Sequence, residues 1–194
     1  MTTILGIQAN GFAVVCSDSR ITDPNQAYVS ATPKVAVNGQ YLLGAAGDVR
    51  AANILHNVFV PPVIHPKLRG RKLDIFITAK FIPALRKCFD DTGYTTSPHA
   101  DDVRHTAEQD STIWVVINGV IYLISCDYAQ VTVASGIYAI GSGQEFAMGA
   151  LQALMPKKTP SVAQCKKIAL RAMYIASYNN FFTAPPFHVF VQAT

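Results

Sequence analysis

Residues 2–22 of the chain read TTILGIQANGFAVVCSDSRIT. Two apolar runs flank the pair Asn10-Gly11, which adopts the positive φ angles of a two-residue turn at little cost. The same pattern recurs around Asn38-Gly39 in KVAVNGQYLLGAAG and around Asn118-Gly119 in TIWVVINGVIYLIS. These segments predict three β-hairpins. A strand is expected to follow the third hairpin, before the next helices, and a final strand is expected at 187–192, after the breaker Pro185-Pro186.

Two helices are predicted between the second and third hairpins. Asp48 is expected to cap a helix that runs to about Phe59. After a loop rich in proline and histidine, apolar residues recur at helical spacing over 73–90, where Pro83 predicts a kink. The polar stretch 93–110 that follows is expected to be irregular.

Two more helices are predicted in the second half of the chain. Apolar residues between 146 and 154 mark the first, and Ser161 with Gln164 forms a capping box that opens the second. Each antiparallel hairpin leaves one apolar face, which a pair of helices can cover. The pattern therefore predicts an α+β protein with four layers, in which two antiparallel sheets pack together and a helix pair flanks each (αββα).

Length and composition limit the class of protein. With 194 residues, of which 50% are hydrophobic and 14% charged, the chain is expected to form one domain over 1–194 with a large core. Its longest apolar runs, 113–117 and 120–124, are far shorter than the ~20 residues that span a bilayer. No secretory signal opens the chain, and the cysteines are scattered, so we expect a cytoplasmic protein that does not bind membranes.

The charge pattern argues against nucleic acid as a partner. The net charge is only +4, and the one basic cluster is interpreted as a solvated loop; it comprises Lys67, Arg69, Arg71 and Lys72. The low charged fraction favours burial of apolar surface against copies of the same chain. No metal site is predicted, because the histidines have no ligand spacing; they are His56, His65, His99, His105 and His188.

Thr2 becomes the first residue if Met1 is removed. Its α-amine would then have an ordinary pKa near ~7.7–8.0, so one residue would carry both a nucleophile and a base. Asp18 follows the second predicted strand and Lys34 opens the third, so that, if the two strands are neighbours, Asp18 can hold Lys34 beside Thr2. A lysine ammonium there would favour the threonine alkoxide. Taken singly, each of these residues is more often inert.

Two glycine segments could add backbone donors. The segment Gly44-Ala45-Ala46-Gly47 leads into the first predicted helix, where an amide could face developing negative charge. Gly141-Ser142-Gly143 precedes the third predicted helix. The spacing G-x-S-x-G of a nucleophile elbow is absent there, so this serine is not predicted to be the nucleophile.

In order along the chain, these segments resemble a proteasome β-type subunit and its simpler bacterial relative HslV. The resemblance rests on residues 2–22, on a lysine sixteen residues after Asp18, on GAAG before a helix and on YAIGSGQEFAMGAL at 138–151. It runs from Thr2 to about residue 154 and continues more faintly through the fourth helix. It implies the N-terminal-nucleophile hydrolase fold and a threonine endopeptidase that hydrolyses unfolded polypeptides.

The resemblance also implies roles for individual residues. Thr2 would be nucleophile and base, Asp18 and Lys34 its electrostatic partners, Gly47 the oxyanion-hole amide and Ser142 a support for the threonine amine. The specificity pocket would be lined by Ile21, Thr32, Ala36 and Ala45. The small Ala45 suggests room for a bulky apolar side chain.

The expected assembly follows from the same resemblance. It implies a homo-oligomeric ring, stacked on a second ring, with an ATP-dependent unfoldase or an α-type cap as partner. No cofactor is expected apart from a monovalent cation on backbone carbonyls near the end of the fourth helix. Maturation would need only the removal of Met1.

Two departures from the family pattern keep alternatives open. Proteasome β-subunits carry an Asp and a Ser in the fourth helix, whereas residues 174–180 read YIASYNN here. Asp48 replaces a second glycine after Gly47, which we interpret as a helix cap. The alternatives are a catalytically inactive ring subunit and a small-molecule amidase on the same scaffold.

Overall fold

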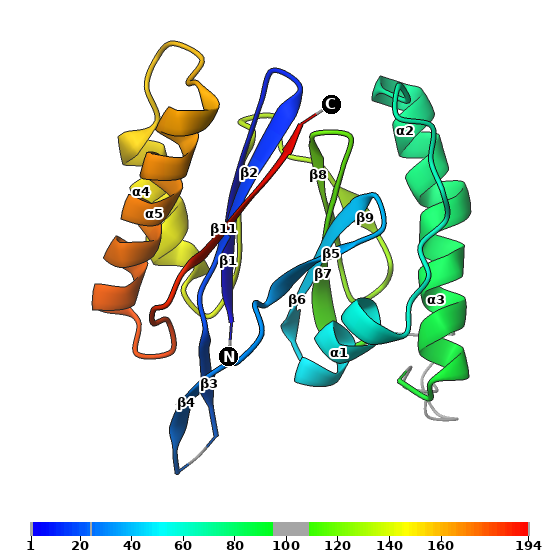
Figure 1. Cartoon of the computed structure of the whole chain (residues 1–194), viewed down its shortest axis with the longest axis horizontal. Coiled ribbons are helices and arrows are strands. Elements are labelled where there is room, and N and C mark those ends of the chain that lie inside the picture. The colour runs from blue at the N-terminus through cyan, green and yellow to red at the C-terminus, as the bar shows by residue number, and fades with distance from the viewer. Residues whose placement is uncertain (1, 24, 95–108, 194) are drawn as a thin grey trace.

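Two antiparallel sheets form the centre of the computed structural model, which describes residues 2–23, 25–94 and 109–193 (Figure 1). One sheet has the order β10 (Ile137–Gly141), β1 (Thr3–Ala9), β2 (Phe12–Ser17) and β11 (His188–Ala193). The other has the order β5 (Val35–Asn38), β6 (Tyr41–Gly47), β7 (Ser111–Ile117), β8 (Val120–Ile124) and β9 (Gln130–Val131). A separate ribbon, β3 (Arg20–Thr22) with β4 (Ala27–Val29), extends beyond the end of β2.

Helices cover the outer face of each sheet. The four-stranded sheet packs against α4 (Gln144–Leu154) and α5 (Val162–Asn179). The five-stranded sheet packs against α1 (Val49–Asn57) and against a long helix made of α2 (Gly70–Phe76), η1 (Ile77–Phe81) and α3 (Ile82–Asp91). The predicted four-layer arrangement is therefore confirmed.

Three apolar clusters hold these layers together, two between a sheet and its helices and one between the sheets. In the central cluster, the buried Trp114 packs edge-on against Tyr138. Gly6 makes room for the indole, since a Cβ there would lie 2.6 Å from the Trp114 ring. This close packing fixes how β1 and β7, one strand from each sheet, lie relative to each other.

The three predicted hairpins are present, with differences in their turns. Asn118 and Gly119 both have positive φ (52° and 73°), as a type I′ turn requires. At the first hairpin Gly11 has positive φ and Asn10 does not. At the second, Asn38 pairs with Tyr41, so the two turn residues are Gly39 and Gln40, one position later than predicted.

The helix predictions hold with one adjustment. Asp48 caps α1 by accepting from Arg50 N at 2.8 Å, and Ser161 and Gln164 form the predicted capping box. The kink predicted at Pro83 is realised as the π-helical turn η1 just before it, where the wider turn accommodates a residue without an N–H. The last strand begins one residue later than predicted, and β3, β4 and β9 were not predicted at all.

Two predictions, the irregular stretch 93–110 and the lack of a membrane-spanning segment, concern what the described residues do not contain. Most of the stretch 93–110, with His99 and His105, lies outside the described residues. No helix in the described ranges is long and apolar enough to cross a membrane.

Candidate active site

Asp18 and Lys34 form a buried ion pair at one end of the sandwich. Asp18 follows β2 and is fully buried, while Lys34 precedes β5 and its side chain is 10% exposed. Lys34 Nζ lies 2.7 Å from Asp18 Oδ1 and also donates to the carbonyl oxygen of Arg20 at 2.5 Å. The structure therefore brings together the two residues that the sequence placed beside Thr2.

The surroundings of this pair fix the ammonium in place. Burial lowers the pKa of Lys34, while the charge and the hydrogen bond of Asp18 act in the opposite direction. The carboxylate also accepts from the backbone N–H groups of Thr3 (2.8 Å), Arg20 (2.9 Å) and Ala184 (3.4 Å). One side chain thus ties β1, β3 and the segment before β11 to the lysine.

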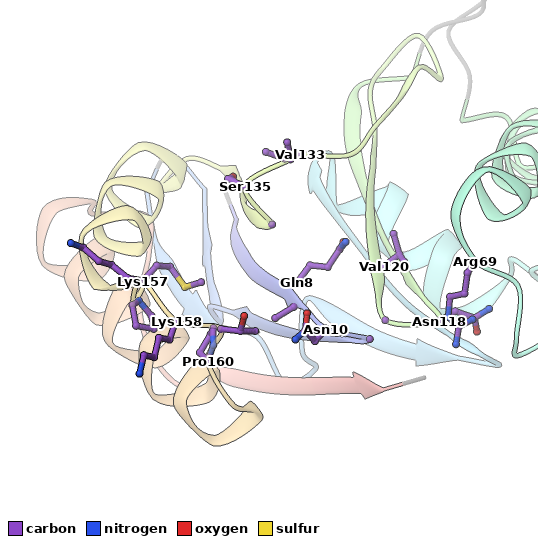
Figure 2. A pocket seen from close by; sticks show the side chains of 18 residues that line it. Gln8, Asn10, Arg69, Asn118, Val120, Val133, Ser135, Lys157, Lys158 and Pro160 are labelled. Atoms are coloured by element: carbon purple, nitrogen blue, oxygen red, sulfur yellow. The ribbon is translucent and has the colours of Figure 1, made fainter.

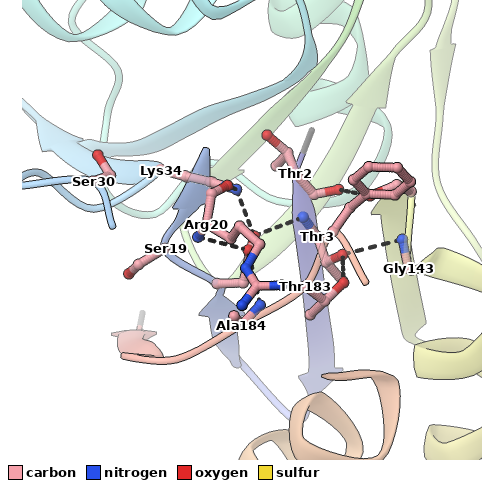
Figure 3. Close-up of polar contacts among 12 residues, drawn as sticks. Thr2, Thr3, Ser19, Arg20, Ser30, Lys34, Gly143, Thr183 and Ala184 are labelled. Atoms are coloured by element: carbon pink, nitrogen blue, oxygen red, sulfur yellow. Dashed lines mark hydrogen bonds and ion pairs between the residues drawn. The ribbon is translucent and has the colours of Figure 1, made fainter. Parts of the chain in front are cut away.

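Thr2 lies at the start of β1, partly buried, on the wall of a cavity of about 160 Å³ that Lys34 and Gly47 also line. In Figure 3 the Lys34 side chain reaches toward the start of β1, where Thr2 and Thr3 lie. The carbonyl oxygen of Thr2 accepts from Ser142 N at 2.8 Å and from Ser142 Oγ at 3.4 Å. Ser142 was predicted to support the amine; these two contacts are with the carbonyl.

Gly141 is needed for that contact. Its φ is +90°, and a Cβ on it would lie 1.9 Å from the Thr2 carbonyl oxygen. No other residue type allows the backbone at 141 to approach Thr2 so closely. The Gly-Ser-Gly segment therefore positions Thr2 through backbone contacts.

Gly47 ends β6 at the rim of the same cavity. Its φ is +137°, and a Cβ would fall 2.4 Å from the carbonyl oxygen of Asp110. Asp48 follows it, lines the cavity and donates its N–H to Ser111 Oγ at 3.0 Å. The carboxylate of Asp48 caps α1, so the interpretation of this residue as a cap is confirmed.

Three of the four predicted pocket residues line the cavity, namely Ile21, Thr32 and Ala45. Ala36 is not among the described lining residues of this cavity; in the five-stranded sheet it pairs with Leu43. The sequence did not point to the face of α1 that forms much of the wall, which carries Val49, Ala52, Asn53 and His56. Their spacing of i, i+3, i+4 and i+7 marks one helix face and could have revealed them.

A second polar cluster that the sequence did not indicate supports the start of β1. The hydroxyl of the buried Thr3 lies 2.6 Å from that of Thr183 and accepts from Gly143 N at 3.1 Å. Asn180, just after α5, donates from Nδ2 to the carbonyl oxygen of Ser142 at 2.7 Å and accepts from Thr183 Oγ1 at 3.3 Å. These residues connect the end of α5 to Thr2 in the region where the family's Asp and Ser are absent.

A larger cavity, of about 580 Å³, opens at the other end of β1 (Figure 2). Gln8 on its wall is six residues from Thr2 along the strand, which is roughly 20 Å at ~3.3 Å per residue. Arg69, Lys157 and Lys158 contribute to this wall, and no carboxylate does among its described lining residues. Lacking a general base next to a nucleophile, this cavity is a weaker catalytic candidate than the smaller one. Within the described ranges, no three His, Cys, Asp or Glu side chains gather as they would around a metal.

The comparisons with known proteins agree with the fold. The model of the family described as "Proteasome subunit" matches residues 111–191. A structure of BPH from Thiobacillus denitrificans in complex with epoxomicin is similar over 98% of each chain, with a TM-score of 0.75 and 14% identity. HslV from Trypanosoma brucei is similar over 99% of each chain, with a TM-score of 0.64 and 24% identity. No curated protein matches the sequence.

The fold is therefore that of the N-terminal-nucleophile hydrolases. The family match over residues 111–191 and the structural likeness to HslV agree with the resemblance to proteasome β-type and HslV subunits that the sequence showed. At 14–24% identity, the structural likeness establishes the fold and leaves the chemistry to be argued from this chain's own residues.

Proposed function

We propose that this protein is a threonine endopeptidase whose nucleophile is Thr2 after removal of Met1. The observation that carries the proposal is the position of Thr2 on the wall of one cavity with Lys34, whose ammonium Asp18 holds from behind. A cation at that position lowers the free energy of the threonine alkoxide, and the amine of the same residue can take the proton.

The reaction would be an acyl transfer in two steps. The Thr2 hydroxyl attacks the peptide carbonyl, its proton passes to the α-amine, and a tetrahedral oxyanion forms. When that intermediate collapses, the C–N bond breaks, the leaving amine takes the proton and an ester remains on Thr2 Oγ. Water then attacks the ester, which releases the acid and restores the hydroxyl.

The remaining site residues would act on charge and position. The Gly47 amide is the proposed donor to the oxyanion, at the rim of the cavity that Thr2 lines. Ser142, Asn180 and the Thr3–Thr183 pair would hold the Thr2 backbone in register with Lys34. Proteasome β-subunits carry an Asp and a Ser in the fourth helix that are missing here. The hydrogen bonds of Asn180 to Ser142 and Thr183 would support the start of β1 in their place, and this favours an active enzyme over an inactive subunit.

We further propose that the subunits form a homo-oligomeric ring, stacked with a second ring, in which Thr2 faces an enclosed chamber. Several large apolar side chains are exposed on the described part of the chain, among them Val60, Val63, Tyr178 and Phe181. Such surface favours burial against other copies. Unfolded polypeptides would then be the substrates, delivered by an ATP-dependent unfoldase or through an α-type cap.

The test is cleavage of an unstructured, quenched-fluorescent polypeptide by the wild type, Thr2→Ala and Thr2→Ser. All three residues are small, so Met1 removal is expected in each case and can be read by intact mass. We expect Thr2→Ala to abolish cleavage, Thr2→Ser to retain part of it, and sedimentation to show the same oligomer for all. If wild-type cleavage survives in Thr2→Ala, the proposal is wrong. If the wild type loses Met1 but cleaves no peptide, the inactive ring subunit is the better account.

A further inference from the structure

The cavity beside Thr2 has a polar wall on the α1 side. Its described lining combines apolar side chains from β3, β6 and α1 with the imidazole of His56 and the amide of Asn53. Both polar residues belong to the helix face that turns toward the cavity, whereas Ala51, Ile54 and Leu55 of the same helix are buried in the core. A substrate side chain that enters this cavity therefore meets α1 along one side.

The tautomer of His56 follows from its contact with the backbone. Its Nε2 lies 3.1 Å from the carbonyl oxygen of Leu43, and a carbonyl can only accept, so Nε2 carries the proton. In the neutral ring Nδ1 is then an acceptor. Burial lowers the pKa of His56, and the bond to Leu43 opposes this only in part, so the neutral ring is favoured near pH 7. His56 thus offers an acceptor to a donor on the substrate.

The charges around the cavity favour an uncharged occupant. Its two charged lining residues are Lys34 and Asp48. Lys34 is already paired with Asp18 at 2.7 Å, and a second cation near it would be repelled. Asp48 is exposed and caps α1, so water screens its charge. An acidic side chain would meet the lone pair of His56 Nδ1, which cannot donate to it, because the proton on Nε2 is given to the Leu43 carbonyl.

We propose that the cavity binds the substrate side chain next to the scissile bond, and that it selects a side-chain amide, that of glutamine or asparagine. His56 would accept from the amide N–H, and the Asn53 amide would pair with the remaining amide atoms. The apolar wall of Ile21 and Ala45 would contact the methylene groups. A volume of about 160 Å³ is the space of about five waters at ~30 Å³ each, which suits a side chain of this size.

This inference rests on the proposed function, and it replaces the bulky apolar preference that Ala45 suggested with a preference for a side-chain amide. It makes His56 and Asn53 specificity-determining residues. Because a site built around hydrogen bonds leaves its own polar groups unpaired when an apolar analogue enters, the discrimination against the analogue should be about tenfold or more.

The experiment uses four peptide substrates that differ only in the residue before the cleaved bond: glutamine, methionine, lysine or glutamate. Methionine matches glutamine in length and lacks the amide. We expect kcat/KM for glutamine to exceed that for methionine at least tenfold, and lysine and glutamate to be the poorest. His56→Leu and Asn53→Leu should each reduce the glutamine-to-methionine ratio about tenfold. His65→Leu, a histidine outside the described cavity lining, should leave the ratio unchanged.

The outcomes separate this inference from the proposed function. Each variant is also treated with two peptide epoxyketones carrying glutamine or methionine at the same position, and adduct formation is followed by intact mass, which reports site integrity without turnover. If Thr2 is labelled and the methionine, lysine or glutamate compound is preferred, the inference is wrong and the proposed function stands. If the His56→Leu ratio equals that of the wild type, the inference is also wrong. If no compound labels Thr2, both fail together.

Discussion

Replacing Asp18 by Asn tests the buried ion pair that organises the site. The substitution removes the charge that faces Lys34 Nζ at 2.7 Å and places an N–H₂ among groups that donate to the carboxylate, those of Lys34, Thr3 and Arg20. Asp18 is fully buried and Lys34 is only 10% exposed, so little water can replace the lost partner. Breaking such a pair from one side costs about 3–5 kcal/mol.

That magnitude is large enough to measure by chemical denaturation. Since small domains have unfolding free energies of ~5–15 kcal/mol, the denaturation midpoint of Asp18→Asn should fall steeply while the m-value stays constant. The surface pair of Lys87 and Asp91 provides the matched control, because its 2.8 Å contact is made at 75% and 61% side-chain exposure. Asp91→Asn should therefore leave the midpoint unchanged within error.

A double variant separates the lost charge from the lost backbone bonds. Asp18→Asn combined with Lys34→Met removes the uncompensated ammonium, so it should recover a substantial part of the loss. If Asp18→Asn unfolds at the same midpoint as Asp91→Asn, the pair is not the buried anchor described above. If the double variant is less stable than Asp18→Asn alone, the stability lost in Asp18→Asn does not come from the unpaired ammonium of Lys34 and is due to the backbone contacts of Asp18.

Three further predictions follow from the described contacts. Thr3→Val keeps the shape and removes the hydroxyl, which leaves Gly143 N–H without its acceptor and removes one of the two contacts of the Thr183 hydroxyl; we expect a loss of about 1–3 kcal/mol, and a cycle with Thr183→Val should show the two substitutions to be non-additive. Burial lowers the pKa of His56 below its usual 6.5, so the unfolded state binds more protons between the two values, and the free energy of unfolding should rise with pH up to about 6.5 and then level off. His56→Gln should have a shallower acid slope in pH-dependent denaturation; equal slopes would contradict the assignment. Gly141→Ala should displace Thr2, because its Cβ would lie 1.9 Å from the Thr2 carbonyl oxygen, whereas Gly149→Ala in α4 meets nothing within 4 Å and should stabilise the helix by up to about 1 kcal/mol. Thermal melting of the two glycine variants compares them directly.

Local patterns were sufficient to predict most of the fold. The Asn-Gly pairs gave the three hairpins, and capping residues gave the starts of α1 and α5, because each signal acts over a few residues. The ribbon β3–β4 was not predicted, since each strand has only three residues and its burial pattern is intermediate or exposed. The turn at 39–40 is one position late because register is set by pairing with Tyr41 and not by the Asn-Gly pair alone.

The candidate site was predictable in part. Asp18 and Lys34 stood out as charged residues at the ends of two apolar strands; they do meet, although β2 and β5 belong to different sheets and are not neighbours within one. Thr183 and Asn180 did not, because their contacts join positions 180 and 38 residues apart, with Thr3 and Ser142 respectively, and depend on how the segment after α5 packs. The role of Ala36 stays a prediction, since the described cavity lining includes Lys34 but not Ala36, which pairs with Leu43.

The most direct test of the central claim is intact mass of the purified protein before and after treatment with epoxomicin, the ligand bound to BPH in the similar structure. The account predicts a protein that begins at Thr2 and gains the mass of one epoxomicin, with the modification mapped to Thr2 and absent from Thr2→Ala. A protein that begins at Thr2 and gains no mass, or one that is labelled equally in Thr2→Ala, would contradict the assignment of Thr2 as nucleophile.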